Sequence, residues 1–215
     1  MKAISLLSGG KDSFLATLIA MEQGFDVISA ITVIPDEESM MFHVPNAMLA
    51  GYVGELIDIK TIFCKESEFE KLIAKLSMEN GNMALVNGAI ASNYQRNKLE
   101  AICTAYEMLC YSPLWRISQD LVMQEIIQRG IRPVIVAVGA EGLGEELLGR
   151  KIDEETVEKL KVLEKKYGLN ITGEGGEYES FVSGYGSRTL EITKFKKNYS
   201  GSSGVLTIEE LIKNF

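Results

Sequence analysis

Short strand candidates alternate with helical segments along the first part of the chain. A β-compatible run at 2–7 leads into a Ser-Gly-Gly turn, and apolar residues then recur at helical spacing up to Gly24. Later strand candidates follow at intervals of about 25–30 residues, the length of a βα unit, at 27–33, 57–63, 83–86 and 109–111. This alternation predicts an α/β fold in which helices cover a parallel sheet.

Two capping signals mark helices within this series. Ser67 with Glu70 forms a candidate capping box before a helix over 69–77. Ser92 with Gln95 forms another, before a helix with an apolar face that includes Leu99.

Beyond a Pro-Leu-Trp segment at 113–115 the pattern becomes less regular, so we place a domain boundary near residue 116. We expect a helix over 119–128, a strand over 134–138 and a helix that begins after Asp153 and stops at Gly168. A glycine-rich, acidic segment at 172–186 precedes a strand at 189–195. The prediction is an α/β domain over 1–116, followed by a smaller α+β domain over 117–215.

Composition limits the function classes. The 22 Lys and Arg against 30 Asp and Glu give a net charge of −8, so we expect no nucleic-acid partner. The three cysteines form no C-x-x-C pair and indicate a reducing compartment, and the single histidine, His43, excludes a multi-histidine metal centre. We interpret His43 as a surface or capping residue. Without a long apolar run or a secretory signal, we expect a cytoplasmic protein with no membrane partner.

The segment Ser8-Gly9-Gly10-Lys11-Asp12-Ser13 is the most informative part of the chain. It lies between the first strand and the first helix, where backbone N–H groups and the helix dipole converge on an anion. The glycines allow close approach to phosphate oxygens, the serines donate hydroxyl bonds and Lys11 adds a positive charge. Asp12 suggests a Mg²⁺ ion or an ordering role in the backbone. The segment is neither a Walker A loop nor a dinucleotide fingerprint.

This turn resembles the SGGxDS loop of the PP-loop ATP pyrophosphatases, which cleave ATP between its α- and β-phosphates. The resemblance implies a Rossmann-like PP-loop domain that binds ATP. It does not identify the substrate.

Three further segments narrow the resemblance. They are 87–96 (NGAIASNYQR), 112–116 (SPLWR) and 173–180 (GEGGEYES). The first two follow predicted strands, at the sheet edge where ligands of α/β folds bind. With the turn they resemble the diphthine–ammonia ligase family over nearly the whole chain, in matching order. The family typically has GEYET where this chain has Gly-Glu-Tyr-Glu-Ser at 176–180.

The resemblance implies ATP-dependent amidation of diphthine on elongation factor 2 with ammonium, through an acyl-adenylate, with release of AMP and pyrophosphate. It implies ATP and Mg²⁺ as cofactors and Lys11, Asp12 and Glu177 as catalytic residues. Asp12 is the candidate residue for the metal, and whether the two are in direct contact stays open. The implied cofactor-binding residues are Ser8, Gly9, Gly10, Lys11, Asp12, Ser13 and Gly88. The implied substrate-binding residues are Asn87, Tyr94, Gln95, Arg96, Trp115, Glu174, Gly176, Glu177, Tyr178 and Glu179.

Diphthine carries a trimethylammonium group, which is best held by aromatic faces and negative charge. Tyr178 and Trp115, with the carboxylates of the 174–179 segment, have the required chemistry. We therefore expect this acidic segment to close over the substrate side of the nucleotide.

Other interpretations stay open. Ser92 and Gln95 can serve only as a helix cap, Trp115 can be a packing element and Arg116 a surface charge. The chain can also be another PP-loop enzyme, such as one that modifies tRNA, or a sensor that binds ATP without turnover. The oligomeric state is open, with a homodimer as one option.

Overall fold

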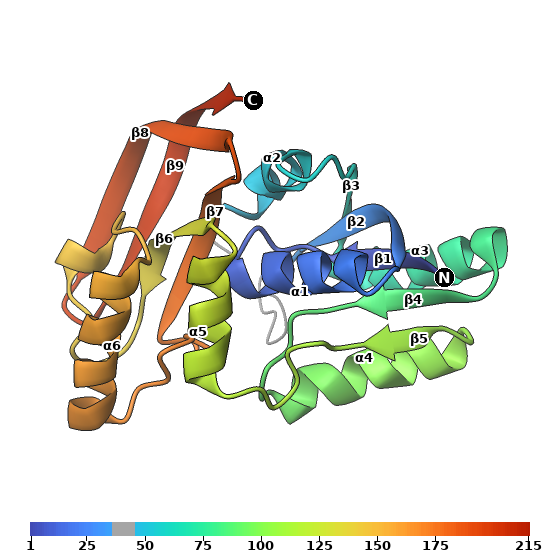
Figure 1. Cartoon of the computed structure of the whole chain (residues 1–215), viewed down its shortest axis with the longest axis horizontal. Coiled ribbons are helices and arrows are strands. Elements are labelled where there is room, and N and C mark those ends of the chain that lie inside the picture. The colour runs from blue at the N-terminus through green and yellow to red at the C-terminus, as the bar shows by residue number, and fades with distance from the viewer. Residues whose placement is uncertain (36–45) are drawn as a thin grey trace. The chain divides into compact units, whose positions relative to one another are not determined.

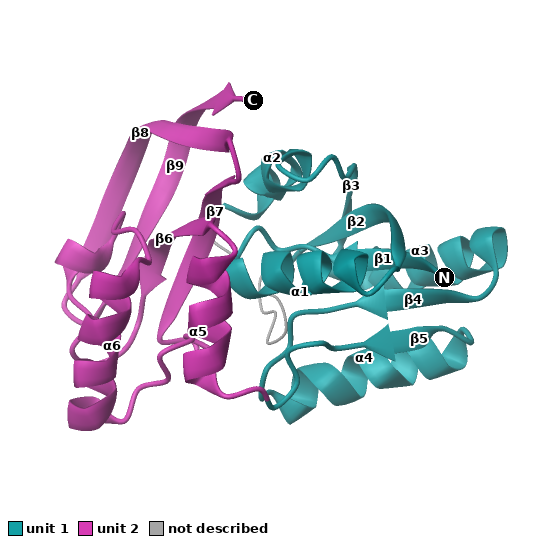
Figure 2. Cartoon of the chain, viewed as in Figure 1, with its two compact units in different colours: residues 1–116 teal, residues 117–215 magenta. Residues whose placement is uncertain are grey.

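The computed structural model describes residues 1–35 and 46–215. These form two compact units, Met1–Arg116 and Ile117–Phe215, coloured separately in Figure 2. His43 lies outside the described residues, so its interpretation stays a prediction. No helix in the described ranges combines the length and the apolar character required to cross a membrane.

The first unit is built on a five-stranded parallel sheet with the order β3-β2-β1-β4-β5 (Figure 1). Its strands are β1 (Lys2–Leu6), β2 (Asp26–Ile34), β3 (Thr61–Lys65), β4 (Met83–Val86) and β5 (Leu109–Tyr111). The chain runs outward from β1 to β3 and then returns to β4 on the other side of β1. The strand order therefore reverses between β1 and β4, where open α/β sheets bind ligands.

Helices cover both faces of this sheet. They are α1 (Lys11–Glu22), the short 3₁₀ helix η1 (Ala47–Leu49), α2 (Ala50–Glu55), α3 (Glu66–Asn80) and α4 (Asn93–Ala105). Alternate residues of β1, such as Ile4, join a buried cluster with Phe69 of α3 and Leu99 of α4. On the opposite face, the hydroxyls of Ser5 and Thr17 lie 2.6 Å apart and connect β1 to α1. The predicted α/β architecture is confirmed.

One strand boundary differs from the sequence prediction. The expected strand at 57–63 begins only at Thr61, because the preceding apolar residues belong to the turn after α2. Asp58 has a positive φ of 58° there, and the Ile59 N–H donates to the Gly54 carbonyl at 3.0 Å. Ile57 and Ile59 are buried without being in a strand, so a continuous apolar run concealed a turn.

The two predicted capping boxes have different outcomes. The one at Ser67 is wrong, because α3 begins directly after β3 at Glu66 and has no side-chain cap. Glu66 and Glu68 instead place negative charge in the first turn, where it interacts favourably with the helix dipole. The cap at Ser92 is confirmed, since its hydroxyl accepts from the Gln95 N–H at 3.3 Å.

The second unit is a closed antiparallel barrel with the order β6-β7-β8-β9 and two longer helices (Figure 1). Its elements are α5 (Gln119–Gln128), β6 (Ile131–Val138), the 3₁₀ helix η2 (Glu145–Leu147), α6 (Glu154–Tyr167), β7 (Tyr178–Tyr185), β8 (Arg188–Ser200) and β9 (Ser203–Asn214). The predicted α+β character is confirmed. The strand expected at 134–138 begins earlier, and β6 contains Pro133 beside a bulge in its pairing with β7.

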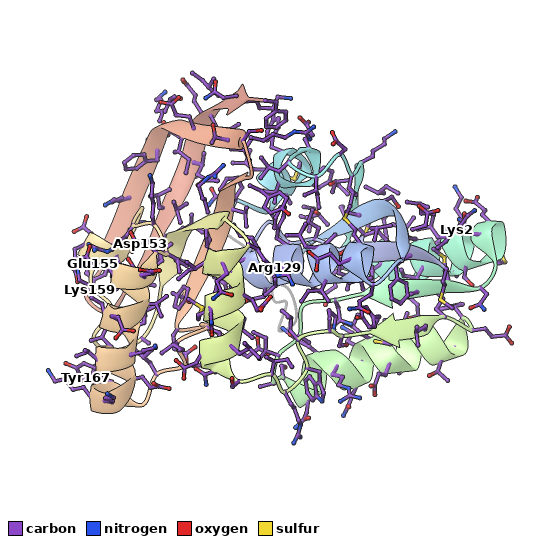
Figure 3. The ribbon with its side chains drawn as sticks, viewed as in Figure 1. Lys2, Arg129, Asp153, Glu155, Lys159 and Tyr167 are labelled. Atoms are coloured by element: carbon purple, nitrogen blue, oxygen red, sulfur yellow. The ribbon has the colours of Figure 1, made fainter. Side chains whose placement is uncertain are left out.

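Helix α6 has both predicted ends, and Figure 3 labels residues along it. The Asp153 carboxylate accepts from the Thr156 N–H at 2.9 Å, and Gly168 adopts the left-handed conformation after the last helical residue. No strand was predicted within the acidic segment at 172–186, but its second half forms β7. Of the residues from Tyr178 to Val182 all except Glu179 are buried, which the glycine and glutamate content concealed.

The long β8–β9 hairpin closes the barrel through few pairs. Among the described strands, β8 pairs with β7 at Thr189 and Arg188, and β9 pairs with β6 at Val205 and Gly204. Between these attachment points the two strands pair along most of their length with each other.

Candidate functional site

The turn 8–13 connects the end of β1 to the start of α1, beside the position where the strand order reverses. Gly9 has a φ of +87°, which a residue with a side chain adopts only at a cost. Gly10 stays extended at the N-cap, and Lys11 is the first helical residue. The turn therefore directs the first N–H groups of a helix toward the sheet edge, as required for binding phosphate.

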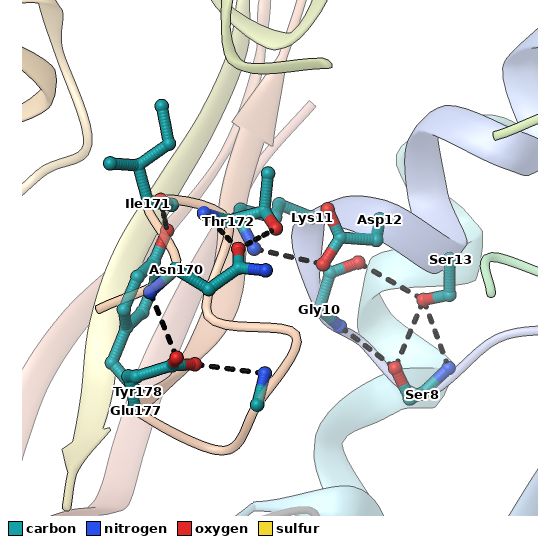
Figure 4. A network of polar contacts seen from close by, with 11 residues as sticks. Ser8, Gly10, Lys11, Asp12, Ser13, Asn170, Ile171, Thr172, Glu177 and Tyr178 are labelled. Atoms are coloured by element: carbon teal, nitrogen blue, oxygen red, sulfur yellow. Dashed lines mark hydrogen bonds and ion pairs between the residues drawn. The ribbon is translucent and has the colours of Figure 1, made fainter. Parts of the chain in front are cut away.

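The Ser13 hydroxyl organises this turn, as the dashed contacts in Figure 4 show. It accepts from the Ser8 N–H at 3.2 Å, lies 3.0 Å from the Ser8 hydroxyl and donates to the Gly10 carbonyl at 3.0 Å. The Ser8 hydroxyl in turn accepts from the Gly10 N–H at 3.3 Å. The two serines thus fix the shape of the turn within the protein itself.

Lys11 and Asp12 form an ion pair inside the turn. The Lys11 ammonium donates to Asp12 Oδ2 at 2.8 Å, and the exposed fractions of the two side chains are 3% and 24%. A buried ammonium group needs a negative partner, and a bound phosphate would add to the one that Asp12 provides.

Gly88 packs directly against this turn. A β-carbon at Gly88 would lie 2.7 Å from the Ser13 nitrogen and 2.8 Å from the Asp12 carbonyl carbon, both backbone atoms. Only glycine fits there without displacing the backbone. The structure thus gives Gly88 a packing role beside the turn, and its contact with the cofactor stays a prediction.

Asn87 connects the ends of two neighbouring strands. Its side chain is buried, donates to the Ser112 hydroxyl at 2.9 Å and accepts from that hydroxyl at 3.1 Å and from the Ala89 N–H at 3.2 Å. Because Ser112 follows β5 and Asn87 follows β4, this pair holds the two loops together. Ser112 was not among the predicted site residues, although it lies in the 112–116 segment, directly after a strand at the same edge.

Cys110 of β5 lies next to this pair. The Cys103 thiol hydrogen-bonds to Cys110 and is the largest cause that lowers the pKa of the Cys110 thiol to about 7, and bonds from Ser112 and Asn87 act in the same direction. The same bond raises the pKa of Cys103. The sequence did not predict this difference between the two thiols.

Two arginines lie against the only tryptophan of the chain. The Arg96 guanidinium carbon is 4.5 Å from the centroid of the Trp115 ring, and that of Arg116 is 5.7 Å away. The neighbouring predicted residues differ in exposure: Tyr94 is 55% exposed and Gln95 is partly buried. The aromatic face at Trp115 is thus already in contact with cations.

Glu177 closes a loop in the second unit, also visible in Figure 4. Its Oε1 accepts from the Asn170 N–H and its Oε2 from the Gly175 N–H, both at 2.8 Å. The carboxylate therefore fixes the shape of the segment that precedes β7.

Tyr178 is buried, and its hydroxyl donates to the Ile171 carbonyl at 2.7 Å. Glu174 and Glu179 are partly exposed, and Gly176 is exposed with a φ of +83°. Glu177 is also partly exposed, so among the predicted substrate residues of this segment only Tyr178 is buried.

The residues present fit a Mg²⁺ ion that arrives with a nucleotide better than a resident metal. Within the ranges 1–35 and 46–215, no three His, Cys, Asp or Glu side chains gather as a metal site. Mg²⁺ is commonly held by one or two carboxylates together with substrate phosphates and water, and Asp12 can supply one carboxylate.

The sheet order and the glycine-rich first turn define a Rossmann-like α/β protein of the PP-loop type. The Diphthamide synthase N-terminal domain model matches residues 1–109, and the Diphthamide synthase C-terminal domain model matches residues 118–213. The chain belongs to the diphthamide synthase family, a family of enzymes. The resemblance found in the sequence is confirmed.

Curated relatives are named diphthine--ammonia ligase. The Bos taurus protein is 30% identical, with 92% of this chain and 81% of that protein covered. The Homo sapiens protein is 28% identical, with 97% and 85% covered. The Schizosaccharomyces pombe protein is 27% identical over 100% of this chain, which spans only 37% of that relative.

Among solved structures, the chain is similar to a predicted subunit of tRNA methyltransferase from Methanocaldococcus jannaschii. The TM-score is 0.48 at 14% identity, with 86% of this chain and 98% of that chain covered. A similarity of this strength carries no information about function.

Proposed function

We propose that this chain is an ATP-dependent ligase that amidates diphthine on elongation factor 2 with ammonium. The observation that carries the proposal is the match of both units to the diphthamide synthase family, in a chain whose first turn has the groups required to bind phosphate. Relatives named diphthine--ammonia ligase support the same reaction.

The proposed reaction overcomes the low reactivity of a carboxylate toward ammonia. The diphthine carboxylate attacks the α-phosphorus of ATP, and pyrophosphate leaves. Ammonia then attacks the acyl-adenylate, AMP leaves, and the nitrogen loses a proton to give the amide. Positioning and charge stabilisation dominate such transfers, so we assign binding of the pyrophosphate part to Lys11, Ser8, Ser13 and the N–H groups of the turn.

We propose that Mg²⁺ enters with ATP and that Asp12 is the protein carboxylate that would help the phosphates to hold it. The metal would neutralise charge on the departing pyrophosphate. In the same proposal, residues 1–116 bind ATP and residues 117–215 contribute the substrate side.

The acidic segment 174–179 is proposed to hold the trimethylammonium group of diphthine. Partly exposed Glu174 and Glu179 provide negative charge, and Gly176 allows close approach of the backbone. We assign Glu177 and buried Tyr178 to positioning, because the hydrogen bonds of both side chains hold the backbone of the segment in place.

A reaction on a translation factor places the protein in the cytoplasm, with elongation factor 2 and ammonium as partners and no nucleic-acid partner. The net charge of −8 is consistent with a protein substrate whose surface is basic around the modified residue.

The test mixes the protein with ATP, Mg²⁺ and ammonium, with and without diphthine-bearing elongation factor 2. AMP formation that requires the factor, with an amide on the factor by mass spectrometry, supports the proposal. AMP formation that requires tRNA instead indicates a tRNA-modifying enzyme, and ATP binding without turnover indicates a sensor. Either of these two results contradicts the proposed function.

A further inference from the structure

The surrounding loops hold the cluster of Arg96, Trp115 and Arg116 in place through backbone and side-chain hydrogen bonds. Residues 112–115 form a β-turn, with the Trp115 N–H donating to the Ser112 carbonyl at 3.1 Å and Pro113 at its favoured second position. Leu114 is 2% exposed and anchors the turn. Ser112 is held in turn by the buried Asn87 amide.

Arg116 has a strained backbone that the surrounding structure maintains. Its φ of 58° lies in the left-handed region, which is unfavourable for a residue with a long side chain. The Arg116 N–H donates to the Ile90 carbonyl at 2.8 Å and fixes this conformation. In this conformation the exposed Arg116 guanidinium lies beside the Trp115 ring.

Contacts within the first unit connect the cluster to the turn 8–13. Gly88 touches the backbone of Asp12 and Ser13, and two residues later the Ile90 carbonyl receives the Arg116 N–H. The loops after β4 and β5 therefore bring the two guanidiniums to the sheet edge next to the turn, on the side away from β2 and β3.

The charges of the cluster favour an anion. In the described part of the chain, the Arg116 side chain forms no ion pair, and Arg96 bonds to Glu100 through its Nε at 2.6 Å, which leaves its other N–H donors for a ligand. Stacked guanidiniums present their N–H groups at the ring edge, in the spacing of a carboxylate or phosphate. A trimethylammonium group at Trp115 would instead meet two positive charges.

We propose that Arg96 and Arg116, held by Trp115, bind the carboxylate of the acceptor beside the α-phosphate of ATP. This inference rests on the proposed function, in which a carboxylate must reach that phosphorus. Arg116 and Trp115 thereby act as acceptor-binding residues, and Asn87 acts on them as a positioning residue through Ser112.

The kinetic test uses Arg116→Gly, because glycine tolerates the positive φ and the variant loses the guanidinium without added strain. We expect the KM for diphthine-bearing elongation factor 2 to rise roughly 10–100-fold, the loss expected for hydrogen bonds to a charged group, and the dissociation constant of ATP to stay unchanged. Arg116→Lys should recover only part of the loss. Lys75→Ala, which removes a charge from a side chain 66% exposed in the same unit, is the matched control.

The outcomes separate this inference from the proposed function. If the wild-type protein forms AMP with the factor and Arg116→Gly has an unchanged KM, the carboxylate site is refuted while the ligase reaction stands. Weaker ATP binding in Arg116→Gly would assign the guanidinium to a nucleotide phosphate and also refute the acceptor site. If the wild-type protein has no factor-dependent activity, the proposed function is refuted, and with it the acceptor site that rests on it.

A second readout does not depend on turnover, because Trp115 is the only tryptophan and reports on its own surroundings. We expect acetate, titrated at constant ionic strength against chloride, to change the tryptophan fluorescence with saturation in the wild-type protein and without saturation in Arg116→Gly. An equal response to acetate in both proteins would overturn the carboxylate assignment. A response that saturates with inorganic phosphate but not with acetate would overturn it as well.

Discussion

Gly88 lies so close to Ser13 that a β-carbon on the glycine would come within 2.7 Å of the serine nitrogen. The loop after β4 and the turn after β1 are therefore in backbone contact, and the shape of one depends on the other. Any ligand at the turn depends on a residue that is more than seventy positions away along the chain.

We predict that Gly88→Ala weakens ATP binding and destabilises the fold by about 1–3 kcal/mol, the usual cost of overpacking. Isothermal titration with ATP and urea unfolding measure the two effects. Gly51→Ala is the matched control, because its β-carbon would meet only the ring of Phe63, an exposed side chain, at 3.2 Å. Normal ATP affinity in Gly88→Ala would mean that the turn and the loop are independent.

We predict that Lys11→Ala raises the barrier to AMP formation by roughly 2–4 kcal/mol, the scale for the loss of one preorganised donor. The variant also leaves Asp12 without its ammonium partner at 2.8 Å. Steady-state AMP release measures the effect, and Lys2→Ala, at an exposed lysine of the same unit (Figure 3), should have normal activity. Near-normal turnover in Lys11→Ala would remove the turn from the mechanism.

We predict that Glu177→Gln lowers stability by about 1–3 kcal/mol, because a glutamine has one acceptor oxygen for the two N–H groups that the carboxylate binds. Thermal unfolding measures this loss. Glu174→Gln is the comparison variant and should reduce acceptor binding with a smaller effect on stability. An unchanged unfolding midpoint in Glu177→Gln would refute the positioning role.

We predict that Asp153→Ala destabilises the protein by about 1 kcal/mol at neutral pH through loss of the cap of α6. The Thr156 N–H is the main cause that lowers the pKa of Asp153 from 3.8. Because the folded-state pKa is the lower one, the charge-dependent stabilisation is complete above the unfolded value and is lost as the pH falls through the folded value. Asp153→Asn should keep a cap but lose this acid dependence in urea unfolding at pH 2–7.

We predict that the Cys110 thiol reacts with iodoacetamide with a midpoint near pH 7, as its lowered pKa requires. Cys103→Ala removes the largest cause of the lowering and should move the midpoint toward the ordinary value of 9.0. Alkylation rates of the Cys110 peptide, followed by mass spectrometry, measure the shift, with Cys64→Ala as control. An unmoved midpoint in Cys103→Ala would contradict this origin of the low pKa.

Local sequence rules predicted those elements that have a clear signal of their own. The helix capped by Ser92 in the first unit and the helix capped by Asp153 in the second have a cap next to a periodic apolar face, and both form as expected. The strand that begins at Tyr178 was missed because glycines and glutamates precede it and its apolar alternation is short. Its burial depends on pairing with β6, a contact between residues far apart in sequence.

The candidate site was predicted as a set of segments, whereas its internal bonds were not. The sequence indicated that Asn87 and Trp115 follow two successive strands, at the carboxyl edge of a parallel sheet. It could not indicate that Ser112 links their loops or that Arg116 adopts a left-handed backbone, because both depend on how the loops fold against each other.

The β8–β9 hairpin has a consequence for how the protein behaves at high concentration. The stretch of β8 beyond its short pairing with β7 is an edge strand, which a second chain could extend into a growing sheet. Lys194, Lys196 and Lys197 lie along this stretch, and the first two form ion pairs with Glu209 across the hairpin. A second chain that paired with this edge would have to remove water from these ammonium groups, which is unfavourable. These lysines therefore protect the hairpin against aggregation.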